Sequence, residues 1–156
     1  MLQRCIIYLF IVICSSSCGS DEPEIENACN LIDCATVSLR LEFVAAATGE
    51  DLFSNNTFDI SSLQMINIQT NEAVNFYAET FGSGDRTVIV LPSFVENSTL
   101  ENYQIFIPDL FDMAFRFSVE VDSDPCCLLN SYSNVAVEAD DITIENTGFA
   151  SYRLLF

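Results

Sequence analysis

The stretch that decides the fold is Val37-Ser38-Leu39-Arg40-Leu41-Glu42-Phe43, in which apolar and polar side chains alternate strictly. Successive side chains of a β-strand point to opposite faces, so this period of two predicts a strand with one buried face and one wet face. Met113–Val121 repeats the pattern, with phenylalanine and valine on one side and polar residues on the other. Two such segments predict a protein built from half-buried strands.

Shorter runs of β-branched and aromatic residues predict further strands, because turn residues separate them. Thr70-Asn71-Glu72 joins the runs Leu63–Gln69 and Ala73–Thr80 and predicts a hairpin. The runs and the two alternating segments together give about nine strands. No segment shows a convincing helical period, although Pro108–Phe111 fits one turn. The runs are Leu63–Gln69, Ala73–Thr80, Thr87–Leu91, Asn102–Ile107, Asn134–Glu138, Asp141–Glu145 and Ser151–Phe156.

Many short strands with closely spaced turns are typical of an all-β, antiparallel β-sandwich of immunoglobulin-like or transthyretin-like type. A closed barrel is the alternative. The predicted sandwich domain spans residues 36–156, which is a length that can form its own core.

The first 17 residues have the order of a secretory signal peptide. Arg4 precedes the apolar run Cys5–Cys14, and Ser15-Ser16-Ser17 then leads to Cys18. The apolar run is shorter than the roughly 20 residues needed to cross a bilayer. A buried N-terminal helix is the alternative to a signal peptide.

Ser15-Ser16-Ser17-Cys18 resembles the lipobox of bacterial lipoproteins, although leucine is usual where Ser15 stands. The resemblance implies that Cys18 is lipidated and becomes the first residue of the mature chain. Gly19–Glu24 resembles the acidic export signal of Bacteroidota lipoproteins, which implies the outer face of the outer membrane. An ordinary acidic tether over residues 18–35 is the alternative for these carboxylates.

Most of the mature chain also resembles small uncharacterised surface lipoproteins of the Bacteroidota. The resemblance is carried by the strand Leu39–Val44, the turn Thr48-Gly49-Glu50-Asp51-Leu52, the step Phe58-Asp59-Ile60 and the late pair Cys126-Cys127. It implies a β-sandwich anchored to the outer membrane and exposed at the cell surface. It implies no activity, because no function is established for that group.

Composition restricts the chemistry of this chain. Its net charge is −18, and it contains no histidine, lysine or tryptophan. Catalysis by Ser-His-Asp or Cys-His groups and Schiff-base chemistry are therefore excluded. The basic residues after Cys18 are Arg40, Arg86, Arg116 and Arg153. So acidic a chain is expected to be repelled by nucleic acid, and its only expected membrane contact is the lipid anchor.

Four cysteines remain after the signal peptide and the lipidated Cys18, namely Cys29, Cys34, Cys126 and Cys127. An even number in an exported domain predicts two disulfides. A bridge between the adjacent Cys126 and Cys127 would be strained, so we expect one of the two connectivities that join the early pair to the late pair. A zinc site is a weaker alternative, because adjacent cysteines suit tetrahedral ligation poorly.

Glu120, Asp122 and Asp124 place carboxylates on one side of a strand end, where hard oxygen ligands could hold Ca²⁺. Asp140-Asp141 would join them if the strands before those residues pair suitably. The alternative is a solvated strand edge whose charges prevent pairing with another chain. The tyrosines after Cys18 either form a binding face or pack at the core and its rim. They are Tyr77, Tyr103, Tyr132 and Tyr152.

The sequence thus predicts a non-enzymatic, surface-anchored lipoprotein without a cofactor. We expect a binding or adhesion module for a glycan, a peptide or an envelope protein, with loops at one end of the sandwich making the contacts. One alternative is an accessory subunit of an outer-membrane uptake or secretion complex. The other is a small hydrolase that uses paired carboxylates.

Overall fold

The computed structural model describes residues 37–82, 85–124 and 127–156. The predicted signal peptide, the lipidation site Cys18 and the tether lie outside these residues. Within the described part, ten strands and the single 3-10 turn Ile60–Ser62 make up the regular structure. No helix in these residues is long and apolar enough to span a membrane.

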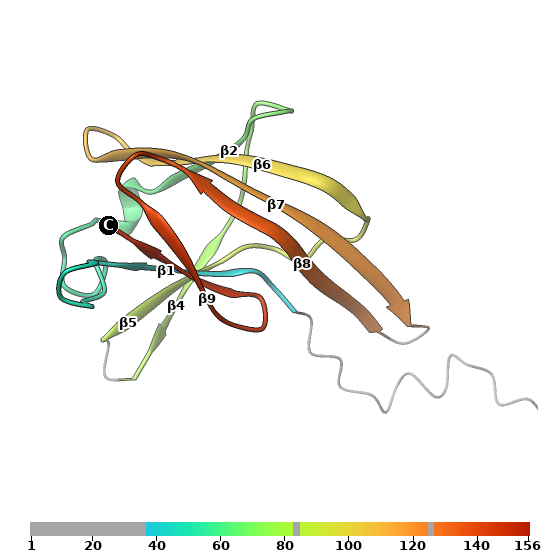
Figure 1. The fold of residues 1–156 in the computed structure, drawn as a ribbon, viewed down its shortest axis with the longest axis horizontal. Coiled ribbons are helices and arrows are strands. Elements are labelled where there is room, and N and C mark those ends of the chain that lie inside the picture. Colours follow the sequence, from blue (N-terminus) through green and yellow to red (C-terminus); the bar gives the residue numbers. More distant parts are fainter. Residues whose placement is uncertain (1–36, 83–84, 125–126) are drawn as a thin grey trace, which may run out of the picture. The chain divides into compact units, whose positions relative to one another are not determined.

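The ten strands form two five-stranded sheets that share no strand (Figure 1). Sheet A has the order β4-β5-β1-β10-β9, and sheet B has the order β3-β2-β6-β7-β8. The prediction of an antiparallel-dominated β-sandwich is confirmed, with ten strands where about nine were expected. The strands are β1 (Arg40–Val44), β2 (Gln64–Asn67), β3 (Glu72–Ala73), β4 (Tyr77–Phe81), β5 (Arg86–Val90), β6 (Ser98–Ile107), β7 (Phe111–Asp124), β8 (Cys127–Glu138), β9 (Thr143–Gly148) and β10 (Ser151–Leu155).

The core lies between the inner faces of the two sheets. Leu39, Leu41 and Phe43 from the first alternating stretch are fully buried there, as are Phe115 and Phe117 from β7. Both alternating segments therefore bury the face that their period predicts. Their rings belong to a network of edge-to-face and stacked aromatic pairs, which adds to the stabilisation from burial.

The first and last strands of the described part pair with each other in sheet A. β1 and β10 run parallel, with Arg40 opposite Ser151 and Val44 opposite Leu155. Phe156 continues this pairing, because its N–H donates to the Val44 carbonyl at 3.0 Å. Its ring lies 5.0 Å from that of Phe111 and 5.6 Å from that of Phe43. The last strand thus occupies an interior position of the sheet and helps to close the core.

The predicted strand Ala73–Thr80 is wrong as a single element. Residues up to Ala73 form β3, which completes a hairpin with β2, whereas β4 pairs with β5 in the other sheet. The hairpin at Thr70-Asn71-Glu72 is confirmed, and Asn71 takes a positive φ of 58° there. Val74 and Phe76 pack against the core while the chain crosses between the sheets. Apolar residues at alternate positions serve such a crossing as well as a strand, so the pattern does not distinguish the two.

β7 and β8 are longer than predicted. β8 begins at Cys127, well before the expected start at Asn134, and pairs along most of β7. Its register shifts between Ser133 and Ala136, and Asn134 takes a positive φ of 53° at this bulge. The residues before Asn134 lack a regular apolar alternation, because the polar Asn130 is buried, two positions before Tyr132, which packs against the core. The pairing of β8 comes from backbone hydrogen bonds that leave no pattern in the sequence.

Candidate functional site

The edge strand β4 is exposed on both of its faces. On the outer face Tyr77 is 52% exposed and Phe81 is 42% exposed. On the inner face Ala78 and Thr80 are also exposed, although the corresponding residues of β5 and β1 are buried. An edge strand that buries neither face is unusual in a sandwich, where one face normally packs on the core.

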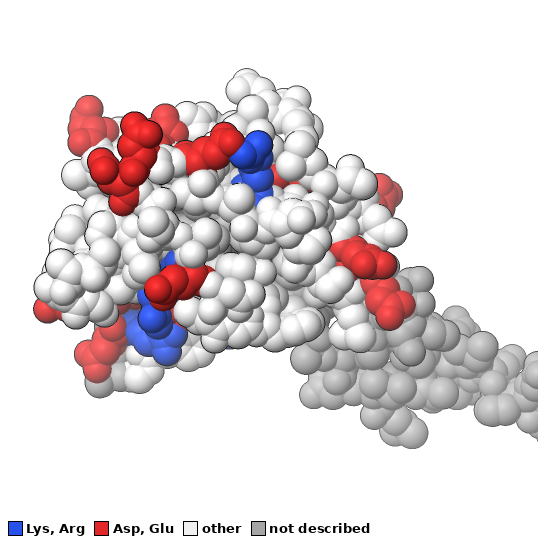
Figure 2. Space-filling model, in the orientation of Figure 1, with Lys and Arg blue, Asp and Glu red and all other residues white. Residues whose placement is uncertain are grey.

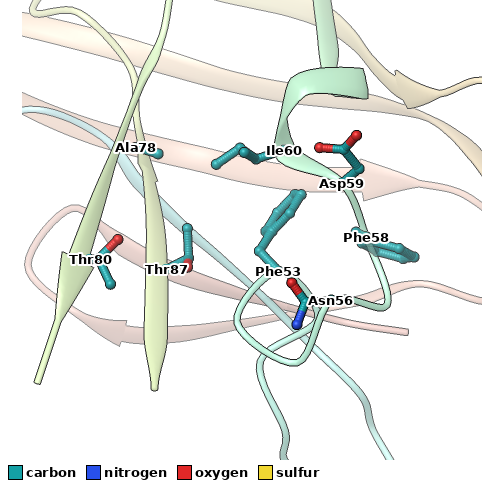
Figure 3. A pocket seen from close by; sticks show the side chains of 8 residues that line it. All are labelled: Phe53, Asn56, Phe58, Asp59, Ile60, Ala78, Thr80 and Thr87. Carbon is teal, nitrogen blue, oxygen red and sulfur yellow. The ribbon is translucent and has the colours of Figure 1, made fainter. Parts of the chain in front are cut away.

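The inner face of β4 borders a hollow of about 320 Å³ (Figure 3). Thr80 and Ala78 from β4 form one wall, and Phe53 and Ile60 from the segment between β1 and β2 form the opposite wall. Asn56 and Asp59 add polar groups at this second wall. An open hollow with apolar walls and a few polar groups has the composition of a binding site.

Asp51 holds the loop that carries Phe53 and Asn56 in place. Its Oδ1 accepts hydrogen bonds from the N–H of Phe53 at 3.0 Å and of Ser54 at 2.8 Å. Its Oδ2 accepts from the N–H of Thr87 on β5 at 2.9 Å. The carboxylate is buried and joins the loop to sheet A by charge-assisted bonds. Asp51 therefore acts as a positioning residue for the hollow rather than as part of its lining.

Asp59 caps the short 3-10 turn that carries Ile60. Its Oδ1 accepts from the Ser61 N–H at 2.9 Å, and its Oδ2 accepts from the Ser61 hydroxyl at 2.8 Å. The Ser61 hydroxyl and then its N–H lower the pKa of this carboxyl below its ordinary value. Asp59 is exposed and stays charged at neutral pH. The hollow thus has a fixed negative group at its rim.

A second hollow, of about 520 Å³, adjoins the first and shares Asn56 and Asp59 with it. Polar residues line most of it, among them Ser61 and Gln64, and Pro108 closes one side. Both hollows are thus bordered by the segment between β1 and β2. In the sequence, Phe58-Asp59-Ile60 carries only the resemblance described above and does not indicate a binding site.

The outer face of sheet A gathers three of the four arginines that follow Cys18. Arg86 on β5 and Arg153 on β10 both donate to Glu42 on β1, and Arg40 pairs with Glu79 on β4 at 3.4 Å. Figure 2 shows acidic side chains spread over the face in view, with few basic ones among them. The arginines are thus dispersed in sequence but assembled on one face, where each lies beside a glutamate.

The predicted calcium ligands are only partly within the described structure. Glu120 and Asp122 are exposed on the outer face of β7, as their alternation predicts, whereas the side chain of Asp124 lies outside the described part. Among the described residues no three acidic or cysteine side chains gather closely enough to hold a metal ion. Asp140-Asp141 follow Glu138, which pairs with Ala114 at the opposite end of β7, so the expectation that they join Glu120 is wrong.

The predicted disulfides also fall mostly outside the described residues. Cys18, Cys29, Cys34 and Cys126 lie outside them, and of Cys127 the structure describes only its backbone place at the start of β8. The two-disulfide prediction therefore remains a prediction.

Three of the four tyrosines are packing residues rather than a binding face. Tyr103 and Tyr152 are buried, and Tyr132 packs against the core and donates to the Val37 carbonyl at 3.2 Å. Only Tyr77 is largely exposed, at the start of β4. The alternative of core and rim packing is thus confirmed for Tyr103, Tyr132 and Tyr152.

No family model, curated protein or solved structure matches this chain.

Proposed function

We propose that this protein is a lipid-anchored binding module on the outer face of the outer membrane, held by Cys18. The observation that carries the binding role is the hollow between β4 and the loop fixed by Asp51, which is lined by both aromatic and polar groups. The segment at Met1–Cys18 supports the anchor, since two or more acyl chains hold a folded domain stably at a bilayer. The ligand belongs to one of three classes, a peptide, a glycan or an envelope protein.

The lipid anchor is tested first, with a Cys18→Ser variant of the full-length protein expressed in its own cells. The variant should leave the membrane fraction, because it lacks the thiol that carries the lipid. Cys14→Ser is the matched control, since Cys14 is expected to leave with the signal peptide. A Cys18→Ser protein that stays in the membrane fraction would contradict the proposed anchor.

The binding role is tested by gentle cross-linking and affinity capture of the tagged full-length lipoprotein, read by mass spectrometry. A peptide, glycan or protein that is captured with wild type and lost when the hollow is blocked by Ala78→Trp supports the binding module. Ala136→Trp, on the outer face of sheet B, is the control substitution. Failure of wild type to enrich any ligand would overturn the proposal.

A second candidate, an accessory subunit of an outer-membrane uptake or secretion complex, is favoured by the aromatic pair Tyr77 and Phe81. Their exposure on an edge strand is a feature of surfaces that are covered by another protein. This candidate predicts a partner in fixed stoichiometry with the lipoprotein. Capture of a ligand in variable, substoichiometric amounts would favour the free-standing binding module instead.

A further inference from the structure

The outward edge of β4 carries backbone groups with no partner strand in the described part of the chain. β4 ends the order of sheet A, and its only neighbour is β5. Unpaired edges of this kind accept another extended chain unless they are blocked by charge, proline or a bulge. Tyr77-Ala78-Glu79-Thr80-Phe81 contains no proline and a single charge, and its pairing with β5 has no bulge.

The backbone groups that face outward belong to Ala78 and Thr80. Leu91, directly after β5, donates its N–H to the Leu39 carbonyl. Every second residue of β5, counted back from Leu91, therefore directs its backbone N–H and C=O toward β1. Thr87 fits, because its N–H donates to Asp51. The remaining residues of β5 direct their backbone groups toward β4 and form the backbone hydrogen bonds with Tyr77, Glu79 and Phe81. By the same alternation, Ala78 and Thr80 point their N–H and C=O groups away from β5.

The side chains beside this edge define what could pair with it. Ala78 and Thr80 border the hollow, so residues of an antiparallel added strand opposite them would present their side chains on the same inner face of sheet A, beside the hollow. The residue of the added strand that lies between these two partners would point to the outer face, opposite Glu79. It would be flanked there by the exposed rings of Tyr77 and Phe81.

The negative charge of the protein favours a basic residue at the position of the added strand that lies opposite Glu79. Glu79 is about one-third exposed, and Asp59 stands at the rim of the hollow. The whole chain carries 23 acidic residues against five basic ones. A basic segment would therefore be attracted at long range, and at close range its basic residue would share Glu79 with Arg40, which pairs with this carboxylate at 3.4 Å.

We infer that β4 binds an extended peptide by strand addition, and that the peptide carries a basic residue between two apolar ones. The inference rests on the proposed binding function and names its site and its ligand class. The two apolar side chains lie on the inner face beside Ala78 and Thr80 at the border of the hollow, and the basic side chain lies over Glu79 between Tyr77 and Phe81. Backbone bonds to Ala78 and Thr80 supply affinity, and the alternating side chains supply specificity.

Two other occupants fit less well. The segment 19–36 of this chain contains no basic residue, so it lacks the central feature of the ligand. A second copy could pair β4 with β4, but the register centred on Glu79 would place two glutamates opposite each other, and like charges in that position are destabilising.

The test is a titration of the full-length protein in detergent with a capped peptide that alternates valine and arginine. We compare it with a peptide of the same composition in two blocks. The alternating peptide should bind at least about tenfold more tightly, and it should slow hydrogen exchange at the amides of Ala78 and Thr80. Equal affinity for both peptides without slowed exchange would mean charge attraction alone and would overturn the inference.

Thr80→Pro removes the outward N–H without removing a bond to β5, and proline is tolerated on an edge in that position. It should weaken the alternating peptide about tenfold, which corresponds to about 1.4 kcal/mol. Thr80→Val keeps the N–H and also replaces the threonine side chain, so Thr80→Pro should bind the alternating peptide about tenfold more weakly than Thr80→Val does. Unchanged binding by Thr80→Pro, or protein that dimerises through β4 and excludes the peptide, would contradict the inference.

Capture from native cells distinguishes this inference from the proposed function. A ligand that is enriched equally by wild type and by Thr80→Pro would leave the binding module standing and remove β4 as its site. No enrichment by wild type would overturn the proposed function itself.

Discussion

Arg153 on β10 donates to Glu42 on β1, with its Nη2 at 3.3 Å and its Nε at 3.4 Å from Glu42 Oε2. The two residues stand opposite each other in the parallel pair that joins the first and last strands. Arg86 on β5 donates to the other oxygen of the same carboxylate. Glu42, whose side chain is only 8% exposed, thus ties three neighbouring strands of sheet A together.

Replacing Glu42 with glutamine should lower the free energy of unfolding by about 1.5–3 kcal/mol. The amide would keep one oxygen acceptor, so one arginine would lose its hydrogen bond and both arginines would lose their charged partner. Because both arginines are partly exposed, the loss should be smaller than for a fully buried ion pair. Urea unfolding measures the change, and Glu96→Gln on an exposed loop is the control. Equal stability of the two variants would show that Glu42 does not tie the strands together.

Replacing Asp51 with asparagine should destabilise the loop beside β4. The new amide nitrogen cannot accept the bond from the Thr87 N–H, which leaves a buried donor unsatisfied at a cost of about 1–3 kcal/mol. Hydrogen exchange at the amides of Phe53 and Ser54 should quicken along with the loss in urea stability. Asp109→Asn is the control, since Asp109 is exposed and asparagine tolerates its positive φ of 64°. Unchanged exchange in the Asp51 variant would refute its positioning role.

Replacing Phe156 with alanine should destabilise the domain by about 2 kcal/mol, less than for a fully buried phenylalanine. The ring contacts Phe43, Phe58 and Phe111, although it keeps partial exposure. Phe149→Ala provides a matched control, because that ring is 75% exposed and its loss should stay within about 0.5 kcal/mol. Thermal and urea unfolding of both variants measure the difference. A similar effect of both substitutions would contradict a role of the last residue in the core.

Stability should fall as the pH rises above about 10. Burial raises the pKa values of Tyr103, Tyr132 and Tyr152 above their ordinary value, and for Tyr103 the hydrogen bond to Glu101 acts in the same direction. Because these pKa values are higher in the folded state, the contribution of the neutral tyrosines to stability is complete below the pKa of an unfolded tyrosine. It is lost as the pH rises toward the folded pKa, because unfolded tyrosines ionise first.

Urea unfolding at about pH 8 and about pH 11, with tyrosinate absorbance recorded in parallel, measures this loss. Tyr103→Phe should reduce the difference between the two conditions, since it removes one buried hydroxyl. Complete ionisation of all the tyrosines below pH 10 without unfolding would contradict the raised pKa values.

Mass mapping of the mature protein should find no free thiol among Cys29, Cys34, Cys126 and Cys127. Each predicted bridge would close a long loop, which is worth about 4–5 kcal/mol in the chain-entropy model. Reduction should therefore lower the unfolding temperature. Two alkylatable thiols in protein prepared without reductant would refute the prediction of two disulfides.

The strands were predictable where one face is buried against the core and the other is wet. Leu39 and Leu41 lie on the buried face and the exposed Arg40 on the other, although that outer face is buried again at Glu42. The pattern failed where the chain crosses between sheets at Val74–Phe76, since both environments favour the same spacing of apolar residues. It also failed over the first half of β8, where the buried Asn130 interrupts the apolar alternation.

By itself, the sequence determined the all-β class, most of the strands and the acidic, histidine-free surface, because local alternation and composition encode these features directly. The tertiary structure alone decided that β1 pairs with β10, that Arg86 and Arg153 share Glu42, and that Ala78 and Thr80 face Phe53 and Ile60. These relationships join segments far apart in the chain. They depend on which strands become neighbours, and that choice is made by the packing of the whole core rather than by any local stretch of residues.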